Sequence, residues 1–258
     1  MQKLIKTETE IESMRSAGRI VAGALQEVGA GLAPGVTTSD LDTQIGAYVK
    51  AKGGVSAFFG YQGFPNNACI SVNSEVIHGL PGSRRLQFGD LLKVDVGVEF
   101  NGMIADGAWT YVVGGLRDAR TQRLIDVTLA ALGKAVDQVK DGAKIFSVSA
   151  AVQDTVEEAG FSVVREFVGH GVGRSLHEEP KIPNFRSSGT KGKLIAGMTV
   201  AIEPMVNAGA PKVNVKSDGW TVETADGSLS AHFEHTVLVT ATGAEILTCC
   251  GSEKNLRA

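Results

Sequence analysis

The first fifty residues carry apolar side chains at helical spacing, and two helices are predicted there. Thr7 and Glu10 form a capping-box pair in front of an apolar series that ends before Gly29. A second apolar series begins near residue 38 and stops before residues 53–54, which are both glycine. The start of the chain is therefore expected to be helical.

From about residue 68 the apolar period changes to two, which predicts strands. Ile70, Val72 and Val76 alternate with polar residues, and Asn73-Ser74 is a candidate bulge or turn. Two helical patterns follow, at 118–139 and 145–158. Strands are then predicted at 161–167, 198–206, 220–224 and 229–240, with Asp226-Gly227 as the turn between the last two.

The segment 90–113 predicts a hairpin that brings two aspartates together. Its first strand has an apolar face, and Asn101-Gly102 supplies a two-residue turn. With that turn, Asp95 faces Ala108 and Asp106 faces Gly97, so both carboxylates share one face. No basic residue is built into the hairpin beside them, and adjacent carboxylates repel unless a cation or a shared proton intervenes. A metal ion is the simplest interpretation, and a solvated face with two surface aspartates is the alternative.

Three further polar residues stand in apolar or glycine-rich surroundings. Glu203 and Glu234 lie in apolar strand patterns, where a buried carboxylate is costly without a partner. His170 is flanked by glycines that allow close backbone approach, although a turn residue is the alternative interpretation. A helical zinc-protease motif, a phosphate loop and a serine nucleophile elbow are all excluded by spacing.

The two halves of the chain repeat short patterns. His78 and His177 each precede a proline by three residues, and Asp95 and Glu203 each follow a glycine by six. We interpret the chain as one domain over residues 1–258, made of two related α/β halves at about 1–115 and 116–250, with one site at their junction. Chance similarity of short strings is the alternative.

Composition narrows the class of protein. The 258 residues include 25 Lys and Arg against 28 Asp and Glu, without a long basic run, which disfavours a nucleic-acid or anionic-membrane binder. The three cysteines, Cys69, Cys249 and Cys250, have no metal-finger spacing and suit a reducing compartment, so a cytoplasmic protein is expected. Neither a signal peptide nor an apolar membrane span is found in the sequence.

Taken in order, the polar residues and three strings around them closely resemble the type I methionine aminopeptidases, over about residues 5–248. The residues and strings are Asp95, Asp106, His170, Glu203 and Glu234, with Gly169-His170-Gly171-Val172-Gly173, Leu176-His177-Glu178-Glu179-Pro180 and Ile202-Glu203-Pro204-Met205. The resemblance implies the α+β pita-bread fold, in which two pseudo-symmetric α/β halves with antiparallel sheet surround a dinuclear metal site. It also implies a cytoplasmic hydrolase that removes the initiator methionine from nascent polypeptides and prefers small second residues.

The resemblance assigns five ligands to two divalent metal ions. Asp95 would chelate one ion, His170 and Glu203 the other, and Asp106 and Glu234 would bridge them. Carboxylates and one imidazole form a hard ligand set that suits Co, Mn or Fe at least as well as Zn. Glu203 would also act as the proton shuttle during hydrolysis.

The resemblance also assigns the substrate contacts. His78 would donate to the departing amide side and His177 would stabilise the oxyanion. Asn73 and Ser230 match backbone positions that bind a monovalent cation in some members, whereas Ile104 stands where histidine is frequent. The methionine pocket would be lined by Phe58, Tyr61, Phe64, Cys69, Leu176 and Trp220, together with His78 and His177.

The partners implied are nascent polypeptide N-termini, acted on by a monomer with no nucleic-acid or membrane requirement. No zinc-finger docking segment is expected, and ribosome association is left open. Two alternatives remain: a proline-directed peptidase of the same fold, and a metal-free binding protein built on it.

Overall fold

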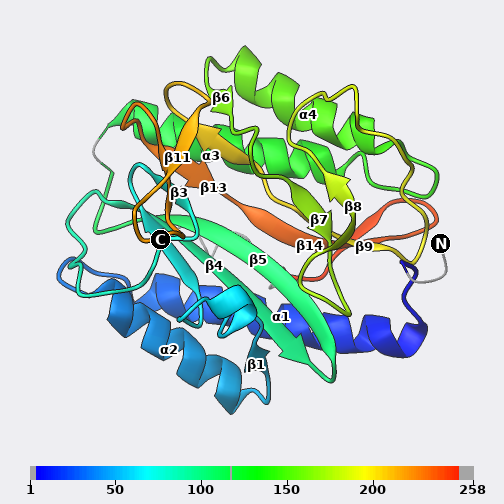
Figure 1. Cartoon of the computed structure of the whole chain (residues 1–258), viewed down its shortest axis with the longest axis horizontal. Helices are drawn as coiled ribbons and strands as arrows, with labels where there is room; N and C mark the ends of the chain where they lie inside the picture. The colour runs from blue at the N-terminus through cyan, green and yellow to red at the C-terminus, as the bar shows by residue number, and fades with distance from the viewer. Residues whose placement is uncertain (1–3, 117, 250–258) are drawn as a thin grey trace.

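The centre of the molecule is a nine-stranded antiparallel sheet (Figure 1), in a computed structural model that describes residues 4–116 and 118–249. Its main path runs β1-β4-β5-β14-β9-β7-β8, and β2 and β15 pair with β4 and β14. These strands are β1 (Val55–Ser56), β2 (Cys69–Val72), β4 (Leu91–Phe100), β5 (Met103–Val112), β7 (Gly169–Gly171), β8 (Glu178–Ile182), β9 (Thr199–Ile202), β14 (Glu234–Val239) and β15 (Ala244–Ile246).

Two three-stranded sheets adjoin it. One has the order β13-β10-β6, from β6 (Ser162–Val163), β10 (Met205–Asn207) and β13 (Ser230–His232). The other has the order β11-β12-β3, from β3 (Glu75–Ile77), β11 (Val213–Val215) and β12 (Val222–Thr224). With four α-helices beside these antiparallel sheets, the described residues form the α+β architecture expected from the sequence.

The two N-terminal helices begin where the sequence predicts. Helix α1 (Glu8–Gly31) has a complete capping box between Thr7 and Glu10, and it continues past Gly29. Helix α2 (Thr38–Ala51) is capped in the same way by Thr37 and Asp40. The apolar side of α1 is buried against β4 and β5, while α2 packs on α1.

The second pair of helices is also confirmed, with one boundary corrected. Helix α4 (Ile145–Glu158) matches its prediction. Helix α3 (Ala119–Val136) is capped by Asp118 but ends three residues before the predicted residue 139. The last amides, of Gln138 and Val139, bond three residues back, so the segment closes as turns rather than continuing the helix.

Two long predicted strands are each divided between two sheets, which corrects the predictions at 198–206 and 229–240. The first breaks into β9 and β10 at Glu203-Pro204, and the second breaks into β13 and β14 at Phe233. Because Pro204 has no amide hydrogen, the ladder cannot continue through it. Both segments therefore pass from the nine-stranded sheet to the three-stranded sheet at the same level. Glu203 and Glu234 lie at this level.

Two other predicted strands are shorter than expected. Of 161–167 only Ser162–Val163 pairs as a strand, and the contact with β10 ends one residue later, where the Val164 amide donates to the Met205 carbonyl at 3.0 Å. Of 220–224 only Val222–Thr224 pairs, because the amides of Trp220 and Thr221 donate to the Asp218 carboxylate in a turn instead. The turn at Asp226-Gly227 is present, with the Gly227 amide donating to the Thr224 carbonyl at 3.3 Å.

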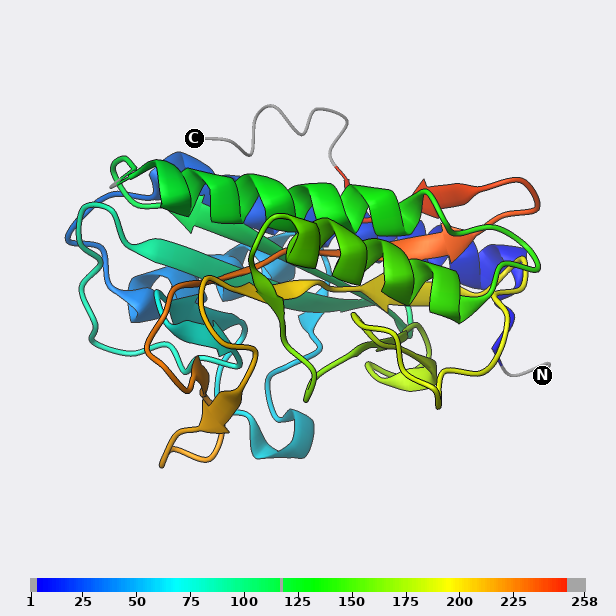
Figure 2. The same ribbon diagram turned by 90° about the horizontal axis from the view of Figure 1, so that it is seen from above.

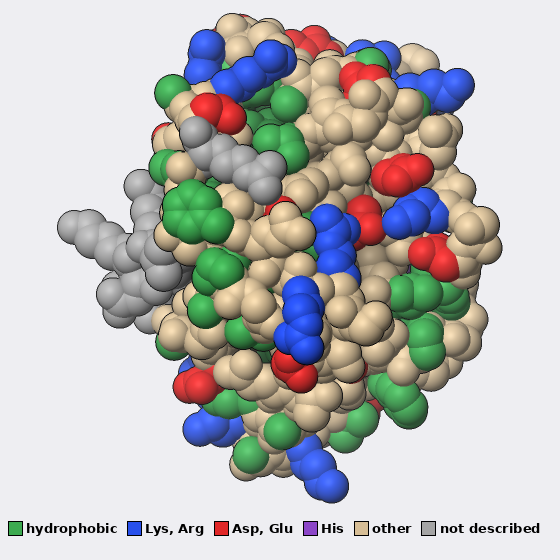
Figure 3. Space-filling view, turned by 90° about the vertical axis from the view of Figure 1, so that its left-hand side faces the viewer, with side chains coloured by type: hydrophobic (Ala, Val, Ile, Leu, Met, Phe, Trp, Pro, Cys, Tyr) green, Lys and Arg blue, Asp and Glu red, His purple; other side chains and the backbone are tan. Residues whose placement is uncertain are grey.

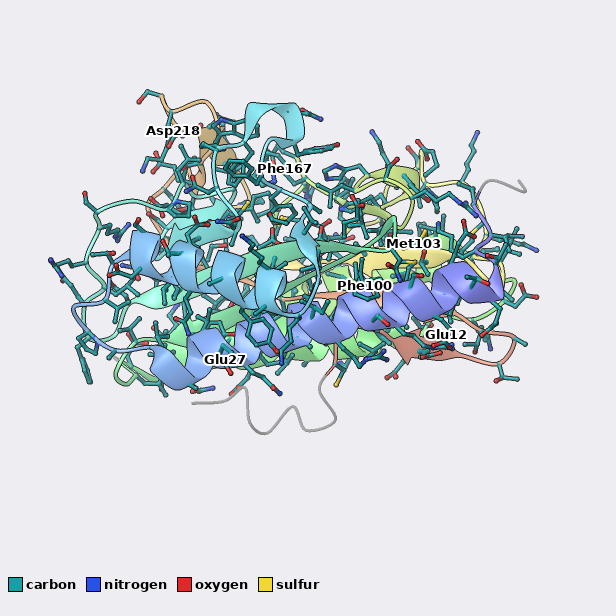
Figure 4. All side chains as sticks on the ribbon, turned by 90° about the horizontal axis from the view of Figure 1, so that it is seen from below. Glu12, Glu27, Phe100, Met103, Phe167 and Asp218 are labelled. Carbon is teal, nitrogen blue, oxygen red and sulfur yellow. The ribbon has the colours of Figure 1, made fainter. Side chains whose placement is uncertain are left out.

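The helices and the long loops lie on opposite sides of the nine-stranded sheet. Figure 2 shows α1, α3 and α4 along one side, whereas the segments of η1 (Tyr61–Gly63), β11–β12 and β7–β8 project from the other. Seen from below, Glu12 and Glu27 of α1 lie on the helix side and Phe167 lies on the loop side (Figure 4). Side chains of the sheet that face the loops are therefore the ones that can form a site.

The surface seen in Figure 3 mixes basic and acidic side chains, so neither sign of charge dominates that face. Among the residues that the structure describes, no helix combines the length and the apolar character needed to cross a bilayer. Cys69 and Cys249 are free thiols, and Cys250 lies outside the described residues.

Candidate metal centre

The predicted hairpin is present with the predicted register. Asn101 and Gly102 form the turn between β4 and β5 with positive φ values of 50° and 75°. Asp95 pairs with Ala108 and Gly97 pairs with Asp106, so the two carboxylates lie on one face of adjacent strands. The solvated alternative is wrong, because Asp106 is only 4% exposed.

The neighbouring strands bring the other three residues to the same face. Glu234 pairs with Ala108 from the opposite side, so it lies in one row with Asp95. Ile202 pairs with His235, which puts the following residue, Glu203, beside Glu234. His170 pairs with Ala201, two residues before Glu203, and alternation directs both toward the loop side. The five residues thus come from β4, β5, β7, β14 and the end of β9.

These carboxylates are buried in a way that requires a compensating charge. Asp95, Asp106 and Glu234 each hold a buried oxygen without a hydrogen-bond partner among the described residues. Burial, followed by repulsion from the neighbouring carboxylates, raises the pKa of Asp95 and Glu234 well above the usual range. The same two causes raise the pKa of Glu203, with Asp106 as the neighbour. Buried acids held together without a basic partner favour a cation between them.

His170 is oriented as a metal ligand. Its Nδ1 lies 2.9 Å from the carbonyl oxygen of Gly171, to which it can only donate. Nε2 then carries the lone pair of the neutral ring, and it lies 3.5 Å from Oε1 of Glu203. Burial lowers the pKa of His170 to about 4, which keeps the ring neutral at neutral pH. A backbone carbonyl that fixes the ring of a ligating histidine is common at metal sites.

The geometry fits at least one metal ion. One ligand atom each of Asp106, His170 and Glu234 lies within 4.8 Å of the others, and all three residues are buried. Asp95 and Glu203 flank this group and extend the ligand set on both sides. The hard oxygen and imidazole donors suit first-row divalent ions.

One expectation from the sequence is wrong: the hairpin does contain a basic residue on this face. Lys93 lies two residues before Asp95 and is 1% exposed. Its Nζ donates to the carbonyl oxygens of Asn73 and Leu91, at 2.8 and 3.4 Å. Because it points to these carbonyls, Lys93 does not pair with the aspartates, and the need for a cation between them remains.

A cavity of about 180 Å³ lies over the carboxylates, and every catalytic, metal-binding and pocket residue expected from the resemblance lines it. Phe64 meets Phe58 and Trp220 edge to face, with ring centroids 6.4 and 5.1 Å apart. Cys69 pairs with Asp95, which joins the apolar wall to the acidic floor. The full set is Phe58, Tyr61, Phe64, Cys69, His78, Asp95, Asp106, His170, Leu176, His177, Glu203, Trp220 and Glu234.

Two residues of this cavity were not expected from the sequence. Val168 lies two residues before His170, so strand alternation could have indicated it. Gln62 lies in the short 3-10 turn with a positive φ of 49°, where no periodicity marks which side chain points inward.

Two more histidines stand at the cavity wall. The ring of His177 contacts the ring of His170, with centroids 4.3 Å apart, and its Nδ1 lies 2.8 Å from the Tyr61 hydroxyl. The ring of His78 packs edge to face on Phe167 at 5.6 Å. Burial lowers the pKa of both histidines, to about 4 for His78, so both are neutral at neutral pH. Each can therefore offer one N–H group to a ligand.

The fold and the buried acidic centre are those of a metallopeptidase, and comparisons with known proteins agree. The sequence profile of metallopeptidase family M24 matches residues 12–241, so the chain belongs to that family. The matched range includes all five of the candidate metal ligands, from Asp95 to Glu234.

Similar proteins include several methionine aminopeptidases. The chain is 46% identical to methionine aminopeptidase 1 of Bacillus subtilis over 95% of this chain and 98% of that protein. It is 45% identical to the methionine aminopeptidase of Clostridium perfringens, with the same coverage. The crystal structure of methionine aminopeptidase from Thermotoga maritima superimposes with a TM-score of 0.92 at 49% identity, covering 95% of this chain and 98% of that one. The chain thus belongs with the methionine aminopeptidases of family M24.

Proposed function

We propose that the chain hydrolyses the first peptide bond of polypeptides that begin with methionine, using two divalent metal ions. The observation that carries this proposal is the meeting of five candidate ligand residues, four of them buried and Asp95 partly buried, with an aromatic pocket in one cavity. Asp95 would hold one ion, His170 and Glu203 the other, and Asp106 and Glu234 both. When bound, such ions polarise the scissile carbonyl and lower the pKa of a water molecule.

The chain's own residues position the substrate and move protons. The methionine side chain would enter between Phe58, Phe64 and Trp220, whose rings suit a polarizable thioether. Glu203 lies beside the acidic cluster, with Oε1 3.5 Å from Nε2 of His170, where a carboxylate can take and return a proton during hydrolysis. The neutral rings of His78 and His177 can donate to the amide nitrogen and the carbonyl oxygen of the scissile bond.

The proposal extends to the setting of the reaction. The chain would act as a monomeric, cytoplasmic catalytic domain on nascent polypeptide N-termini, and its halves 1–115 and 116–250 would share the centre. The pairing of β5 with β14 supports this, since the ligands Asp106 and Glu234 meet there from the two halves. A small second residue is preferred because the narrow cavity of about 180 Å³ leaves little room beyond the pocket.

The test is kcat/KM for Met-Ala-Ser, Met-Lys-Ser, Leu-Ala-Ser and Ala-Pro peptides, measured with protein loaded with Mn²⁺ or Co²⁺. Protein from which a chelator has removed the metal is the control. Met-Ala-Ser should be cleaved fastest, with Leu-Ala-Ser slower by roughly 10–200-fold, the range that pocket shape supplies. Equal rates for the first three peptides would reject methionine specificity. Preference for Ala-Pro would instead support a proline-directed peptidase, and bound metal without any cleavage would support a binding protein.

A further inference from the structure

Lys93 is a buried lysine whose hydrogen bonds go to backbone carbonyls. Its side chain lies on the loop face of β4, between Ser71 of β2 and Thr110 of β5. Nζ donates to the carbonyl oxygen of Asn73 at 2.8 Å and to that of Leu91 at 3.4 Å. A positively charged group against converging carbonyl oxygens is the arrangement in which proteins hold a bare cation.

The Asn73 carbonyl has no capacity left for another positive partner. Besides the Lys93 amino group, it accepts the amide hydrogen of Ser230 at 3.1 Å. A carbonyl oxygen offers two lone pairs, and these two donors use both. The Ser230 hydroxyl in turn donates to the Val206 carbonyl at 3.0 Å. The Asn73 carbonyl therefore does not fit the monovalent cation expected at Asn73 and Ser230.

The position of the Asn73 carbonyl is firmly fixed. Asn73 has a positive φ of 58° in the turn between β2 and β3, and its amide donates to the Leu91 carbonyl at 2.8 Å. Its side chain accepts from the Leu91 amide and donates to Asp90, both at 2.9 Å. The turn after β2, the start of β4 and the start of β13 thus meet at one oxygen.

This junction supports three strands that lead to the metal centre. Strand β4 carries Asp95, β3 leads directly to His78, and β13 leads through Phe233 to Glu234. A group that donates hydrogen bonds to the carbonyl at the junction therefore stabilises the placement of residues on all three strands.

We propose that the amino group of Lys93 takes the place of a monovalent cation at Asn73, so that this junction needs neither Na⁺ nor K⁺. The lysine is covalently attached, so the junction is complete at any salt composition. The replacement does not depend on titration, because a neutral amine still has two N–H groups for the two carbonyls. The inference is independent of which peptide the centre cleaves.

Thermal unfolding of the metal-loaded protein in choline, sodium or potassium chloride at one ionic strength tests the proposal. The wild-type protein should unfold at the same temperature in all three salts. Lys93→Ala should unfold at a lower temperature in choline chloride and recover roughly 3–8 °C in sodium or potassium chloride, the range expected for one buried unsatisfied carbonyl. Lys216→Ala is the matched control, because Lys216 is bonded to Glu75 in the same region but not to Asn73. This control should show no preference among the salts.

A second measurement keeps the proposal testable if Lys93→Ala does not fold. Crystals of the wild-type protein soaked in rubidium chloride should show no anomalous peak at the Asn73 carbonyl. Crystals of Lys93→Gln, soaked in the same way, are the comparison in which the Lys93 amino group is absent. A rubidium ion bound to Asn73 in the wild-type protein would overturn the proposal. It would also be overturned by a wild-type unfolding temperature that depends on potassium, or by a folded Lys93→Ala variant that is indifferent to the salt.

Discussion

The Tyr61 hydroxyl lies 2.8 Å from Nδ1 of His177, and the two rings are tilted at 45° with centroids 5.4 Å apart. In the tautomer in which the Tyr61 hydroxyl donates to Nδ1, the proton of the neutral His177 ring is on Nε2. Nε2 is the nitrogen that remains available to a substrate. Tyr61 was expected as a wall of the methionine pocket, and its hydroxyl also contacts the ring of His177, which makes it a candidate positioning residue.

Tyr61→Phe is therefore expected to lower kcat by about 2–10-fold with a smaller change in KM, because one orienting hydrogen bond is lost. Steady-state kinetics with Met-Ala-Ser measures both constants. Tyr111→Phe is the control: its hydroxyl donates to the Leu25 carbonyl at 2.6 Å, away from the cavity, so stability should fall while kcat holds. A rise in KM alone for Tyr61→Phe would restrict Tyr61 to the pocket wall.

His177 itself should matter more than its partner. The bond proposed for it forms to the oxyanion that develops in the transition state, so His177→Ala should lower kcat by about 10²–10³-fold. KM should change less, because the bound substrate gains little from that bond. The rates of His177→Ala and of the double variant with Tyr61→Phe should be nearly equal, since Tyr61 acts through the missing ring. A His177→Ala variant with nearly wild-type kcat would remove this role.

The hairpin shows what the sequence could predict. A two-residue Asn-Gly turn fixes the pairing register, and the register alone puts Asp95 and Asp106 on one face. The helix starts could be predicted equally well, because Thr7 and Asp118 cap their helices through hydrogen bonds to residues only three positions away. Local rules therefore yielded half of the acidic centre and most helix boundaries.

The remainder depends on contacts that are remote in sequence. Glu203 and Glu234 sit where two strands leave one sheet for another, and an apolar run gives no sign of that crossing except Pro204. Lys93 reads as an ordinary strand residue because its partner, the Asn73 carbonyl, is a backbone group twenty residues away. The position of His170 on β7 was likewise hidden, since a strand of three residues among glycines has no periodicity.

Removing one ligand should abolish activity without unfolding the protein. In Asp106→Ala the backbone stays tied, because its amide and carbonyl both bond to the Thr236 hydroxyl at 2.8 Å. Activity should fall by roughly 10³-fold or more, as several kcal/mol of carbonyl polarisation are lost. Circular dichroism should show a folded protein, and Asp126→Ala on α3 should keep full activity. Loss of activity through unfolding of Asp106→Ala would contradict this separation of site and fold.

Metal removal should make stability fall as pH rises. In the chelated protein the pKa values of Asp95 and Glu234 are raised, mainly by burial, so the folded state keeps protons that the unfolded chain has lost. Stability must then decrease with pH from the unfolded-state values, near 4, up to the folded-state values. Each retained proton contributes about 1.4 kcal/mol per pH unit.

The lowered pKa values of the histidines change the pH dependence of stability in the opposite direction. The measurement must therefore be made above the pH at which histidines of the unfolded chain titrate. Burial lowers the pKa of His170 and His235 to about 4, so at acidic pH the unfolded chain binds protons that the folded protein does not. Above about pH 7.5 the histidines of both states are largely neutral. The pKa of Lys93, lowered by burial to about 7, then acts against the carboxylates, but Asp95, Glu203 and Glu234 outnumber it. Urea unfolding between about pH 7.5 and 8.5 should show a free energy of unfolding that falls with pH in chelator and is much flatter with Mn²⁺, because bound cations hold the carboxylates deprotonated in the folded state. A flat or rising curve for the chelated protein would show that the acids are already ionised without metal, against the repulsion inferred for them.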